Sequence, residues 1–325
     1  MDVLITGVAG YIGAHVAHEF LENGHNVIGI DDLSSGKKEF VDPRIDFVQG
    51  SVQDENTLNR AFAKIKNKDS SGVVHCAGYK YAGESLKIPL EFYENNFFST
   101  LQLIQKMKEF SLKNLVYSSS CSIYGEISGD SPVKEHSEKN PISPYGRSKL
   151  FSELMIADAA ATGLLNCYSL RYFNVAGNGN ISAHDVSPYN LFPILYRSII
   201  NKEPFRVFGS DFPTKDGTCV RDYVDVTLLA KQHFNAMKNL ISGIDRGFHA
   251  FNLGSGIGHS VLEITDAAKR LIYPNLEIIF ENPREGDPSY VVADTKLAKK
   301  LLNWQHSISL DEMTISGWKA FQKNK

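Results

Sequence analysis

Cysteine is scarce in this sequence, and its placement argues against disulfides and zinc sites. No paired spacing relates the four cysteines, which are Cys76, Cys121, Cys167 and Cys219. Two of them lie in apolar, strand-like runs, where a reduced and buried thiol is the usual state. His15 and His18 lie close together on an expected helix, but no further ligand type is near them. We therefore expect neither a disulfide nor a metal centre.

An excess of positive charge is also absent. Lysine and arginine number 34 against 37 aspartates and glutamates, so the formal net charge is −3. Nucleic acid and anionic membranes are therefore not the expected partners. Met1 leads directly into an apolar run without a basic leader, and no later run has membrane length. We expect a cytoplasmic protein, and 325 residues suffice for two domains.

A glycine turn follows the first apolar run. The expected elements are a strand over Val3–Thr6, a helix that ends at Glu22 and a second strand over Asn26–Asp31. Gly7, Gly10 and Gly13 have G-x-x-G-x-x-G spacing, and glycine lets the backbone approach a pyrophosphate at the helix N-terminus. Asp31 stands where a carboxylate binds the ribose hydroxyls of NAD and repels the 2′-phosphate of NADP. We expect NAD as cofactor; the alternative is that Asp31 only ends a strand at a turn.

Strands and helices continue to alternate along the chain. Further strands are expected over Ile45–Val48, Gly72–Ala77 and Leu115–Ser120, with a helix over Leu58–Ile65. Strands separated by helices of this size form a parallel sheet with both faces covered. The sequence therefore predicts an α/β fold with a Rossmann-type, doubly wound parallel sheet, whose ligands bind at the carboxyl ends of the strands.

A long helix with a wide apolar stripe is expected over residues 90–110. The stripe comprises Leu90, Tyr93, Phe97, Leu101, Ile104 and Met107, with Phe92, Phe98 and Leu103 on its flanks. One side can cover the sheet while the other contacts a partner. We predict a homodimer through this helix and the helix that carries Tyr145. The alternative is a single, deeply buried helix.

Tyr145 and Lys149 stand four residues apart on a helix that is expected to start near Ser143. Residues at this spacing share one helix face, which places the phenol beside the ammonium. Lys149 can then favour the phenolate of Tyr145, whose unperturbed pKa is about 10. Ser120, in a hydroxyl cluster at a strand end, can hydrogen-bond Tyr145 and a substrate hydroxyl. The alternatives are a surface Tyr–Lys pair and a plain serine-rich turn.

Longer motifs surround these residues. They are Thr6–Gly13, His75–Lys80, Glu94–Asn96, Ser118–Ser120, Tyr145 with Lys149, Leu170–Asn174, Asp216–Tyr223, Asn252–Gly254 and Arg284–Asp287. On these motifs the chain resembles the extended short-chain dehydrogenases/reductases and, among them, the UDP-glucose 4-epimerase family. The resemblance runs nearly from end to end.

The resemblance implies an NAD site. Its residues would be Gly7, Gly10, Tyr11, Ile12, Gly13, Asp31, Asp32, Ser34, Ser35, Ser51, Val52, Ala77, Gly78, Lys80, Asn95, Ser118, Tyr145, Lys149 and Tyr172. Lys149 would bind the nicotinamide ribose while it holds the pKa of Tyr145 down. Ser51 departs from the family, which usually has an aspartate near the adenine at this position.

A UDP-sugar substrate is implied as well. Its contacts would be Ser120, Tyr145, Asn174, Asn190, Leu191, Phe208, Arg221, Arg284, Asp287 and Val291. A planar guanidinium grips a diphosphate through paired hydrogen bonds. Residues 1–174 would form the NAD-binding domain, to which the chain returns around 222–253, and residues 175–325 would mainly form a smaller C-terminal α/β substrate domain. The loop 178–188 is shorter than in many relatives.

The implied activity is epimerisation at C4 of the hexose of a UDP-sugar such as UDP-galactose or UDP-glucose. Tyr145, with Ser120 bridging, takes the proton of the 4-hydroxyl while C4 delivers hydride to NAD, and hydride returns to the other face of the 4-keto sugar. One alternative is a 4,6-dehydratase, which has an acid pair where this chain has Cys121 and Ser122. Others are a 4-epimerase of pentose or uronic acid sugars and a non-catalytic NAD-binding scaffold.

Val291 bears on the choice of sugar. It stands where enzymes restricted to glucose and galactose often have a tyrosine, whereas Tyr290 is one step away and, in a strand, points to the other face. Valine leaves more room beside C2 of the sugar. We therefore predict that the 2-acetamido sugars UDP-GlcNAc and UDP-GalNAc are also accepted.

Overall fold

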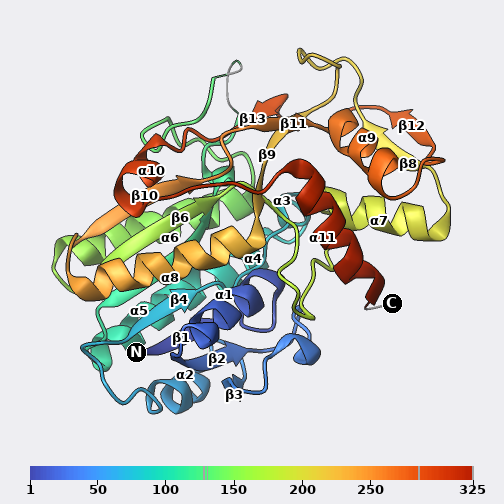
Figure 1. Cartoon of the computed structure of the whole chain (residues 1–325). Coiled ribbons are helices and arrows are strands. Elements are labelled where there is room, and N and C mark those ends of the chain that lie inside the picture. The colour runs from blue at the N-terminus through green and yellow to red at the C-terminus, as the bar shows by residue number, and fades with distance from the viewer. Residues whose placement is uncertain (127–128, 130, 285, 324–325) are drawn as a thin grey trace. The chain divides into compact units, whose positions relative to one another are not determined.

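The computed structural model describes residues 1–126, 129, 131–284 and 286–323 (Figure 1). The chain divides into two compact units, each with its own sheet and apolar core. Unit 1 comprises Met1–Gly125, Glu138–Arg171 and Leu229–Phe251. Unit 2 comprises Glu126–Ser137, Tyr172–Leu228 and Asn252–Lys325.

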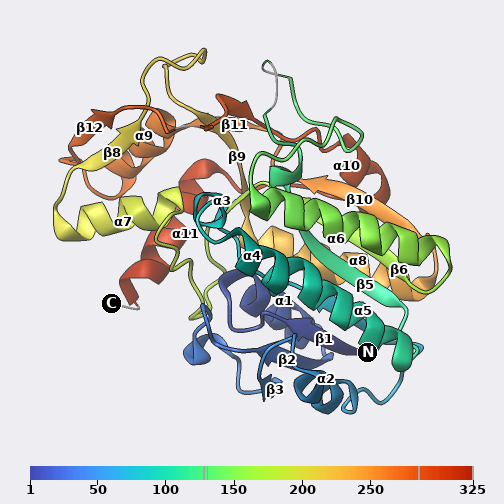
Figure 2. The same cartoon turned by 180° about the vertical axis from the view of Figure 1, so that it is seen from behind.

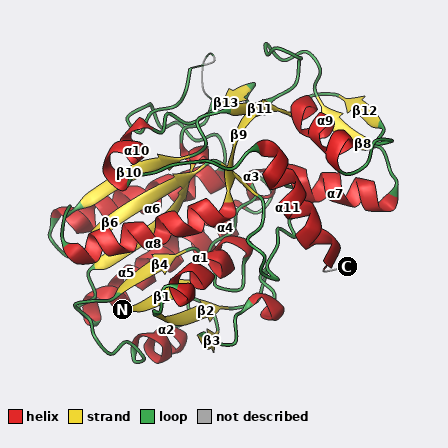
Figure 3. Ribbon diagram, viewed as in Figure 1, coloured by secondary structure: helices red, strands yellow, loops and turns green. Residues whose placement is uncertain are grey.

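A seven-stranded sheet forms the centre of unit 1 (Figure 3), in the order β10-β6-β5-β4-β1-β2-β3. Its strands are β1 Asp2–Thr6, β2 Asn26–Asp31, β3 Asp46–Gln49, β4 Gly72–His75, β5 Asn114–Ser120, β6 Asn166–Tyr172 and β10 Phe248–Leu253. The pairs β3·β2, β2·β1, β1·β4 and β4·β5 are parallel. Every residue of β1, β4 and β5 is buried, as in a parallel sheet covered on both faces.

Helices cover both faces of this sheet. On one face lie α1 (Tyr11–Glu22) and α8 (Val226–Ser242), where the rings of Phe20 and Phe234 pack with centroids 5.3 Å apart. On the other face lie α5 (Ser99–Glu109) and α6 (Pro144–Ala161), as Figure 2 shows, with α2 (Glu55–Phe62) against α5. The predicted doubly wound α/β fold is therefore confirmed.

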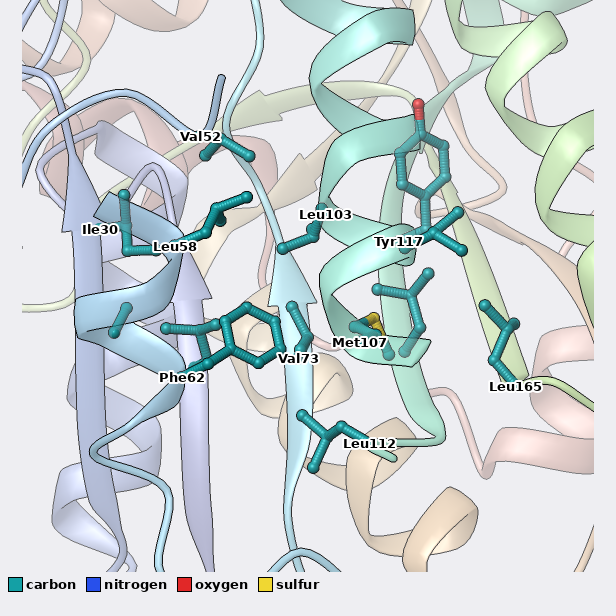
Figure 4. Packing of buried hydrophobic residues seen from close by; sticks show 14 of the residues in the cluster. Ile30, Val52, Leu58, Phe62, Val73, Leu103, Met107, Leu112, Tyr117 and Leu165 are labelled. Atoms are coloured by element: carbon teal, nitrogen blue, oxygen red, sulfur yellow. The ribbon is translucent and has the colours of Figure 1, made fainter. Parts of the chain in front are cut away.

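The core of unit 1 fills the space between the sheet and the helices α2, α5 and α6 (Figure 4). Phe62, Val73 and Leu103 are completely buried within it. Burying a side chain of this size contributes about 1.5–3 kcal/mol through the apolar area removed from water. The core therefore fixes the positions of these three helices on the sheet.

The helix expected over residues 90–110 is not α-helical throughout. It consists of α4 (Pro89–Phe92), a π-helical stretch η2 (Tyr93–Phe98) and α5. A π turn contains about one more residue than an α turn. This small change in the spacing of the apolar residues is not recognisable in the sequence, so the π stretch was not predicted. The Oγ of Ser99 donates to the carbonyl of Asn95, and the Oγ1 of Thr100 donates to that of Asn96 at 2.6 Å. These bonds hold the two asparagines at the π stretch.

The boundaries of α2 also differ from the prediction of Leu58–Ile65. The helix starts at Glu55 because the carboxylate of Asp54 accepts hydrogen bonds from the amides of Asn56 and Thr57, each at 3.1 Å. It ends at Phe62, one turn earlier than expected. The Asp54 cap, which lies outside the apolar pattern, explains the earlier start.

The remaining short elements of unit 1 lie at the connections of the sheet. They are η1 Lys38–Phe40, α3 Ala82–Ser85 and η3 Cys121–Ile123. The strand predicted over Gly72–Ala77 ends at His75, and that over Leu115–Ser120 extends back to Asn114. None of the helices that the structure describes is both long and apolar enough to span a bilayer.

Unit 2 is built from short strands and four helices. In β11-β9-β13, the central β9 also pairs with β7, and β8 pairs with β12 in a separate sheet. The strands are β7 Asn174–Ala176, β8 Phe205–Phe208, β9 Val220–Asp225, β11 Gly258–Ser260, β12 Ile278–Glu281 and β13 Tyr290–Val291. The helices are α7 Leu191–Asn201, α9 Val261–Leu271, α10 Lys296–Leu302 and α11 Leu310–Lys323. Leu195, Val207 and Ile264 are fully buried in its core.

Candidate active site

The turn between β1 and α1 admits only glycine at two positions. A Cβ on Gly13 would lie 2.0 Å from the carbonyl oxygen of Gly7, and one on Gly7 would lie 2.7 Å from the amide nitrogen of Ala77. Gly7 also has a φ of +73°, which other residues rarely adopt. Gly10 is the N-cap of α1 and has no side chain to accept hydrogen bonds from the first-turn amides. These amides can therefore bind phosphate oxygens, and the turn fits a dinucleotide.

Asp31 is buried at the end of β2 and fastens this turn to the sheet. Its Oδ2 accepts a hydrogen bond from the amide of Ala9 at 2.9 Å, and its Oδ1 accepts one from Leu33 at 2.8 Å. Burial raises the pKa of this carboxyl, and the two amide bonds act in the opposite direction. A carboxylate oxygen has more than one lone pair, so Asp31 can accept ribose hydroxyls as well. Asp31 thus has the structural role that was its alternative, and this role is compatible with the predicted ligand role.

Tyr145, Lys149 and Ser120 come together in the interior of unit 1. The helix α6 begins at Pro144, directly after its N-cap Ser143, which confirms the predicted start. Tyr145, Lys149 and Ser120 are 9%, 6% and 8% exposed. Ser120 lowers the pKa of the Tyr145 phenol, and its own hydroxyl donates to the Oγ of Ser122 at 3.1 Å. The Nζ of Lys149 donates to the carbonyl of Ser118 at 2.9 Å.

Burial shifts the pKa values of Tyr145 and Lys149 in opposite directions. In each case the shift favours the neutral form of the side chain. It raises the pKa of Tyr145 to about 12, against a lowering by the Ser120 hydrogen bond. It lowers the pKa of Lys149 to about 8, against the charges of Cys76 and Glu153. Burial therefore outweighs the lowering of the Tyr145 pKa that was expected from Lys149. The ammonium is turned to a backbone carbonyl, and the serine is the group that acts on the phenol.

Two neighbouring asparagines hold the loop that follows β4. The Oδ1 atoms of Asn95 and Asn96 accept hydrogen bonds from the amide of Tyr79 at 3.0 and 2.7 Å. Asn96 also donates to the carbonyl of Tyr79 at 3.0 Å and to the Oγ of Ser148 at 3.1 Å. Sequence reasoning named Asn95 and missed Asn96, although the two stand together in one motif. The loop fixed here carries the predicted cofactor residues Ala77, Gly78 and Lys80.

Other predicted NAD residues of unit 1 lie at the turns after β2 and β3. The Oδ1 of Asp32 accepts hydrogen bonds from the amide and the hydroxyl of Ser34, at 2.9 and 2.6 Å. The Oγ of Ser51 accepts one from the amide of Gln53 at 3.1 Å. The others are Tyr11, Ile12, Ser35 and Val52. Tyr172, by contrast, belongs to unit 2.

The two arginines predicted to bind the substrate both lie in unit 2 with partners. The Nη2 of Arg221 lies 3.4 Å from the Oδ1 of Asp287. The guanidinium carbon of Arg284 lies 4.0 Å from the centroid of the Phe208 ring. Stacking on an aromatic face fixes the plane of a guanidinium and leaves its N–H groups free to donate at the edge.

Three further residues predicted for the substrate lie near the ends of unit 2 elements. Asn174 begins β7, where it is paired with Tyr223 of β9. Asn190 is the N-cap of α7, directly before Leu191, and its Nδ2 donates to the Oδ2 of Asp185 at 2.7 Å.

Val291 and Arg221 are partners in the parallel pair β13·β9, as are Tyr290 and Val220. Paired residues of neighbouring strands point to the same face of a sheet, and successive residues alternate. Val291 therefore shares a face with Arg221, and Tyr290 points to the opposite face.

A buried ion pair, missed by sequence reasoning, stands one helical turn beyond Lys149. Glu153 of α6 accepts from the Nη2 of Arg171 at 2.6 Å and from Ser169 at 2.7 Å, and the Nη1 of Arg171 donates to the Tyr124 hydroxyl at 2.9 Å. The motif Leu170–Asn174 contained the arginine, but its partner is 18 residues away in sequence. Within the described part of the chain, no group of three His, Cys, Asp or Glu side chains is suited to hold a metal ion.

We expect Gly13→Ala to abolish NAD binding, because the added methyl group overlaps the carbonyl oxygen of Gly7. Calorimetric titration of the variant with NAD should show binding weakened at least ~100-fold, about 2.7 kcal/mol. Gly83→Ala is the matched control, because a Cβ there meets no atom within 4 Å. Equal NAD affinity of Gly13→Ala and the natural protein would refute the role of this turn.

Comparison with known proteins connects this geometry to a family. Residues 3–254 match the family model described as the NAD dependent epimerase/dehydratase family. A UDP-glucose 4-epimerase of Lactobacillus helveticus is 36% identical over 98% of this chain and 96% of its own length.

Solved structures are similar over the whole chain. A UDP-glucose-4-epimerase from Stenotrophomonas maltophila, with bound NAD and formylated UDP-arabinopyranose, superposes with a TM-score of 0.93 at 34% identity, covering 99% of this chain and 98% of that one. The UDP-Glc/GlcNAc 4-epimerase of Campylobacter jejuni does so with a TM-score of 0.85 at 31% identity, covering 99% of each. The predicted family and the predicted NAD dependence are confirmed. The chain therefore belongs to the NAD dependent epimerase/dehydratase family and, within it, to the UDP-glucose 4-epimerases.

Proposed function

We propose that Tyr145, Ser120 and Lys149 carry out the 4-epimerisation of a UDP-sugar, UDP-galactose to UDP-glucose, in this protein. The observation that carries the proposal is that Tyr145, Lys149 and Ser120 are all buried within unit 1, where Ser120 acts on the pKa of the Tyr145 phenol. A hydroxyl in this position can pass a proton from the sugar's 4-hydroxyl to the tyrosine. NAD bound by unit 1 would supply the hydride acceptor and donor that inversion at C4 requires.

Tyr145 must lose its proton to act as the base. Its pKa of about 12 keeps the phenol neutral at pH 7, so a positive charge nearby is required for proton transfer. Lys149, one turn further along α6 and equally buried, is the cation that this chain offers. We assign it to the nicotinamide ribose and to the stabilisation of the phenolate.

The glycine turn and its neighbours are proposed to hold the dinucleotide. The amides of Tyr11, Ile12 and Gly13 at the start of α1 would bind the pyrophosphate. Asp31 would bind the adenosine ribose. The remaining predicted contacts are Gly7, Gly10, Asp32, Ser34, Ser35, Ser51, Val52, Ala77, Gly78, Lys80, Asn95, Ser118 and Tyr172.

Unit 2 is proposed to bind the UDP part of the substrate, and unit 1 to bind NAD. Arg221 and Arg284 would bind the diphosphate, since each offers N–H donors in a fixed plane. Stacking of Arg284 on Phe208 supports this assignment. Asn174, Asn190, Leu191 and Asp287 are the other proposed contacts. The cytoplasmic location expected from the sequence stays a prediction.

The register of β13 on β9 supports a wide sugar specificity. Val291 and not Tyr290 shares a face of the sheet with Arg221. If Arg221 binds the diphosphate, the smaller side chain is the one that faces the substrate. We propose that 2-acetamido sugars such as UDP-GlcNAc and UDP-GalNAc are also accepted. The similarity to the UDP-Glc/GlcNAc 4-epimerase of C. jejuni agrees with this proposal.

A homodimer through the helical segment of residues 89–109 and α6 is also proposed. Leu90, Phe98, Phe151 and Leu154 are 76%, 45%, 43% and 55% exposed on these helices. The rings of Tyr93 and Phe151 stack with centroids 6.1 Å apart, which joins the two helices into one apolar surface. Exposed apolar side chains grouped in this way are typical of protein interfaces.

Replacing Tyr145 by phenylalanine should lower kcat for UDP-galactose about 10³-fold, because the proposed proton acceptor is removed. NAD binding should persist. Turnover is followed as UDP-glucose formed without added reductant. Tyr168→Phe is the control, since that hydroxyl faces Asp245 at 3.4 Å. Natural activity in Tyr145→Phe would disprove the assignment.

The natural protein should convert UDP-GlcNAc as well as UDP-glucose, and Val291→Tyr should lose the first activity. The larger side chain fills the space beside C2 and should reduce UDP-GlcNAc turnover about 100-fold while UDP-glucose turnover changes little. Val291→Ala, which only adds room, should keep both. No turnover of UDP-GlcNAc by the natural protein would contradict the specificity proposal.

Analytical ultracentrifugation should show a dimer at micromolar concentration. The double variant Phe98→Glu with Leu154→Glu should sediment as a monomer, because two charges would be buried in an apolar interface. Ile244→Glu is the control, as Ile244 is 69% exposed on another part of unit 1. A monomeric natural protein would rule out the dimer.

A further inference from the structure

The first turn of α6 takes its hydrogen-bond acceptors from two different parts of unit 1. Pro144 occupies the first helical position and has no N–H, so the next amides are those of Tyr145 and Gly146. The N-cap Ser143 accepts from Gly146 at 3.1 Å. The amide of Tyr145 donates instead to the Oγ of Ser85, also at 3.1 Å, although Ser85 is 60 residues away in sequence.

Ser85 is well suited to hold this amide in place. Its side chain is completely buried, and its hydroxyl proton is engaged, because it donates to the carbonyl of Ala82 at 2.6 Å. The oxygen therefore presents its lone pairs to Tyr145 in one orientation. An N-cap serine usually serves one amide of the first turn, so Ser143 alone leaves the amide of Tyr145 without an acceptor.

The same segment also contacts the ring of Tyr145. Phe92, which is completely buried, meets this ring edge to face with centroids 6.3 Å apart. Phe92 packs in the same way on Tyr79, with centroids 5.4 Å apart. The segment of residues 79–92 therefore contacts Tyr145 in two places. Ser85 binds its backbone amide, and Phe92 packs against its ring.

This segment is itself anchored where the cofactor is expected. The amide of Tyr79 is held by Asn95 and Asn96, and Lys80, a proposed NAD contact, is the next residue. The amide of Ser85 donates to the carbonyl of Tyr81 at 3.0 Å. Hydrogen bonds thus fix the segment to the π stretch at Tyr79 and to the backbone of Tyr145 at Ser85.

We infer that Ser85 is a positioning residue for Tyr145, through which the segment of residues 79–92 sets the direction of the phenol. The inference rests on the proposed role of Tyr145 as the proton acceptor. Rotation of the first turn of α6 displaces the phenol from Ser120, and misplacement by about 1 Å can cost 10²-fold in rate. Phe92 then limits the tilt of the ring, and Ser85 limits the movement of its backbone.

Ser85→Ala and Ser143→Ala make a matched pair, because each removes one serine acceptor from the same helical turn. Both should lower the melting temperature to a similar extent. Ser85→Ala should lower kcat for UDP-galactose about tenfold, with KM for the UDP-sugar and Kd for NAD changed less than about twofold. Ser143→Ala should keep kcat within about twofold of the natural value.

Equal kcat values of the two variants would overturn the inference, since helix capping alone would then explain the contact. Should Ser85→Ala fail to fold, kcat of Phe92→Leu tests the inference instead, because this variant keeps an apolar side chain but loses the ring contact with Tyr145. An unchanged kcat of Phe92→Leu would count against the inference. Tyr145→Phe is measured in parallel. An active Tyr145→Phe refutes the proposed function, whereas an inactive one with a normal Ser85→Ala refutes only the role of Ser85.

Discussion

Close approach of main chains at the glycine turn is the constraint on which the rest of unit 1 depends. The start of α1 lies so near the turn that a single methyl group on Gly13 would lie 2.0 Å from a carbonyl oxygen. Gly7 is in equally close contact with the backbone of Ala77, which follows β4. Because no side chain intervenes, β1, α1 and the loop after β4 meet through their backbones. The first amides of α1 therefore lie at the carboxyl edge of the sheet, where the loops carrying Lys80 and Ser120 also begin.

Burial of ionisable side chains is the second constraint, and it acts on α6. Glu153 and Arg171 are both 3% exposed, and burying such charges is costly unless they are paired. Here the guanidinium donates to both oxygens of the carboxylate and to Tyr124, so both charges of the pair have partners. The pair joins α6, β6 and the segment after Ser120. The helix that carries Tyr145 and Lys149 and the segment that follows Ser120 are thereby both fixed to β6.

The sequence was sufficient to predict the sheet, because apolar runs alternate with helices. It was also sufficient to predict the start of α6, because serine favours the N-cap position and proline favours the first helical position. It was insufficient where residues outside the apolar pattern decide the outcome. Asp54 caps α2 ahead of its first apolar residue, and the apolar spacing of residues 90–110 does not reveal the π stretch. The pKa of Tyr145 could not be predicted because burial, and not the nearby lysine, dominates it. The contact of Ser85 with Tyr145 gives no signal in either local pattern.

The two shifted pKa values have a joint consequence for binding. Burial raises the pKa of Tyr145 and lowers that of Lys149, so in both cases it favours the neutral form. A site that disfavours charge responds strongly to any charge that enters it, since screening by water is weak. A cation bound beside the phenol lowers the pKa of Tyr145, and by linkage such a cation binds more tightly as the pH rises towards that pKa. Oxidised nicotinamide is a cation and its reduced form is neutral, so with the cofactor bound beside Tyr145 as proposed, its redox state would shift the pKa of this buried phenol.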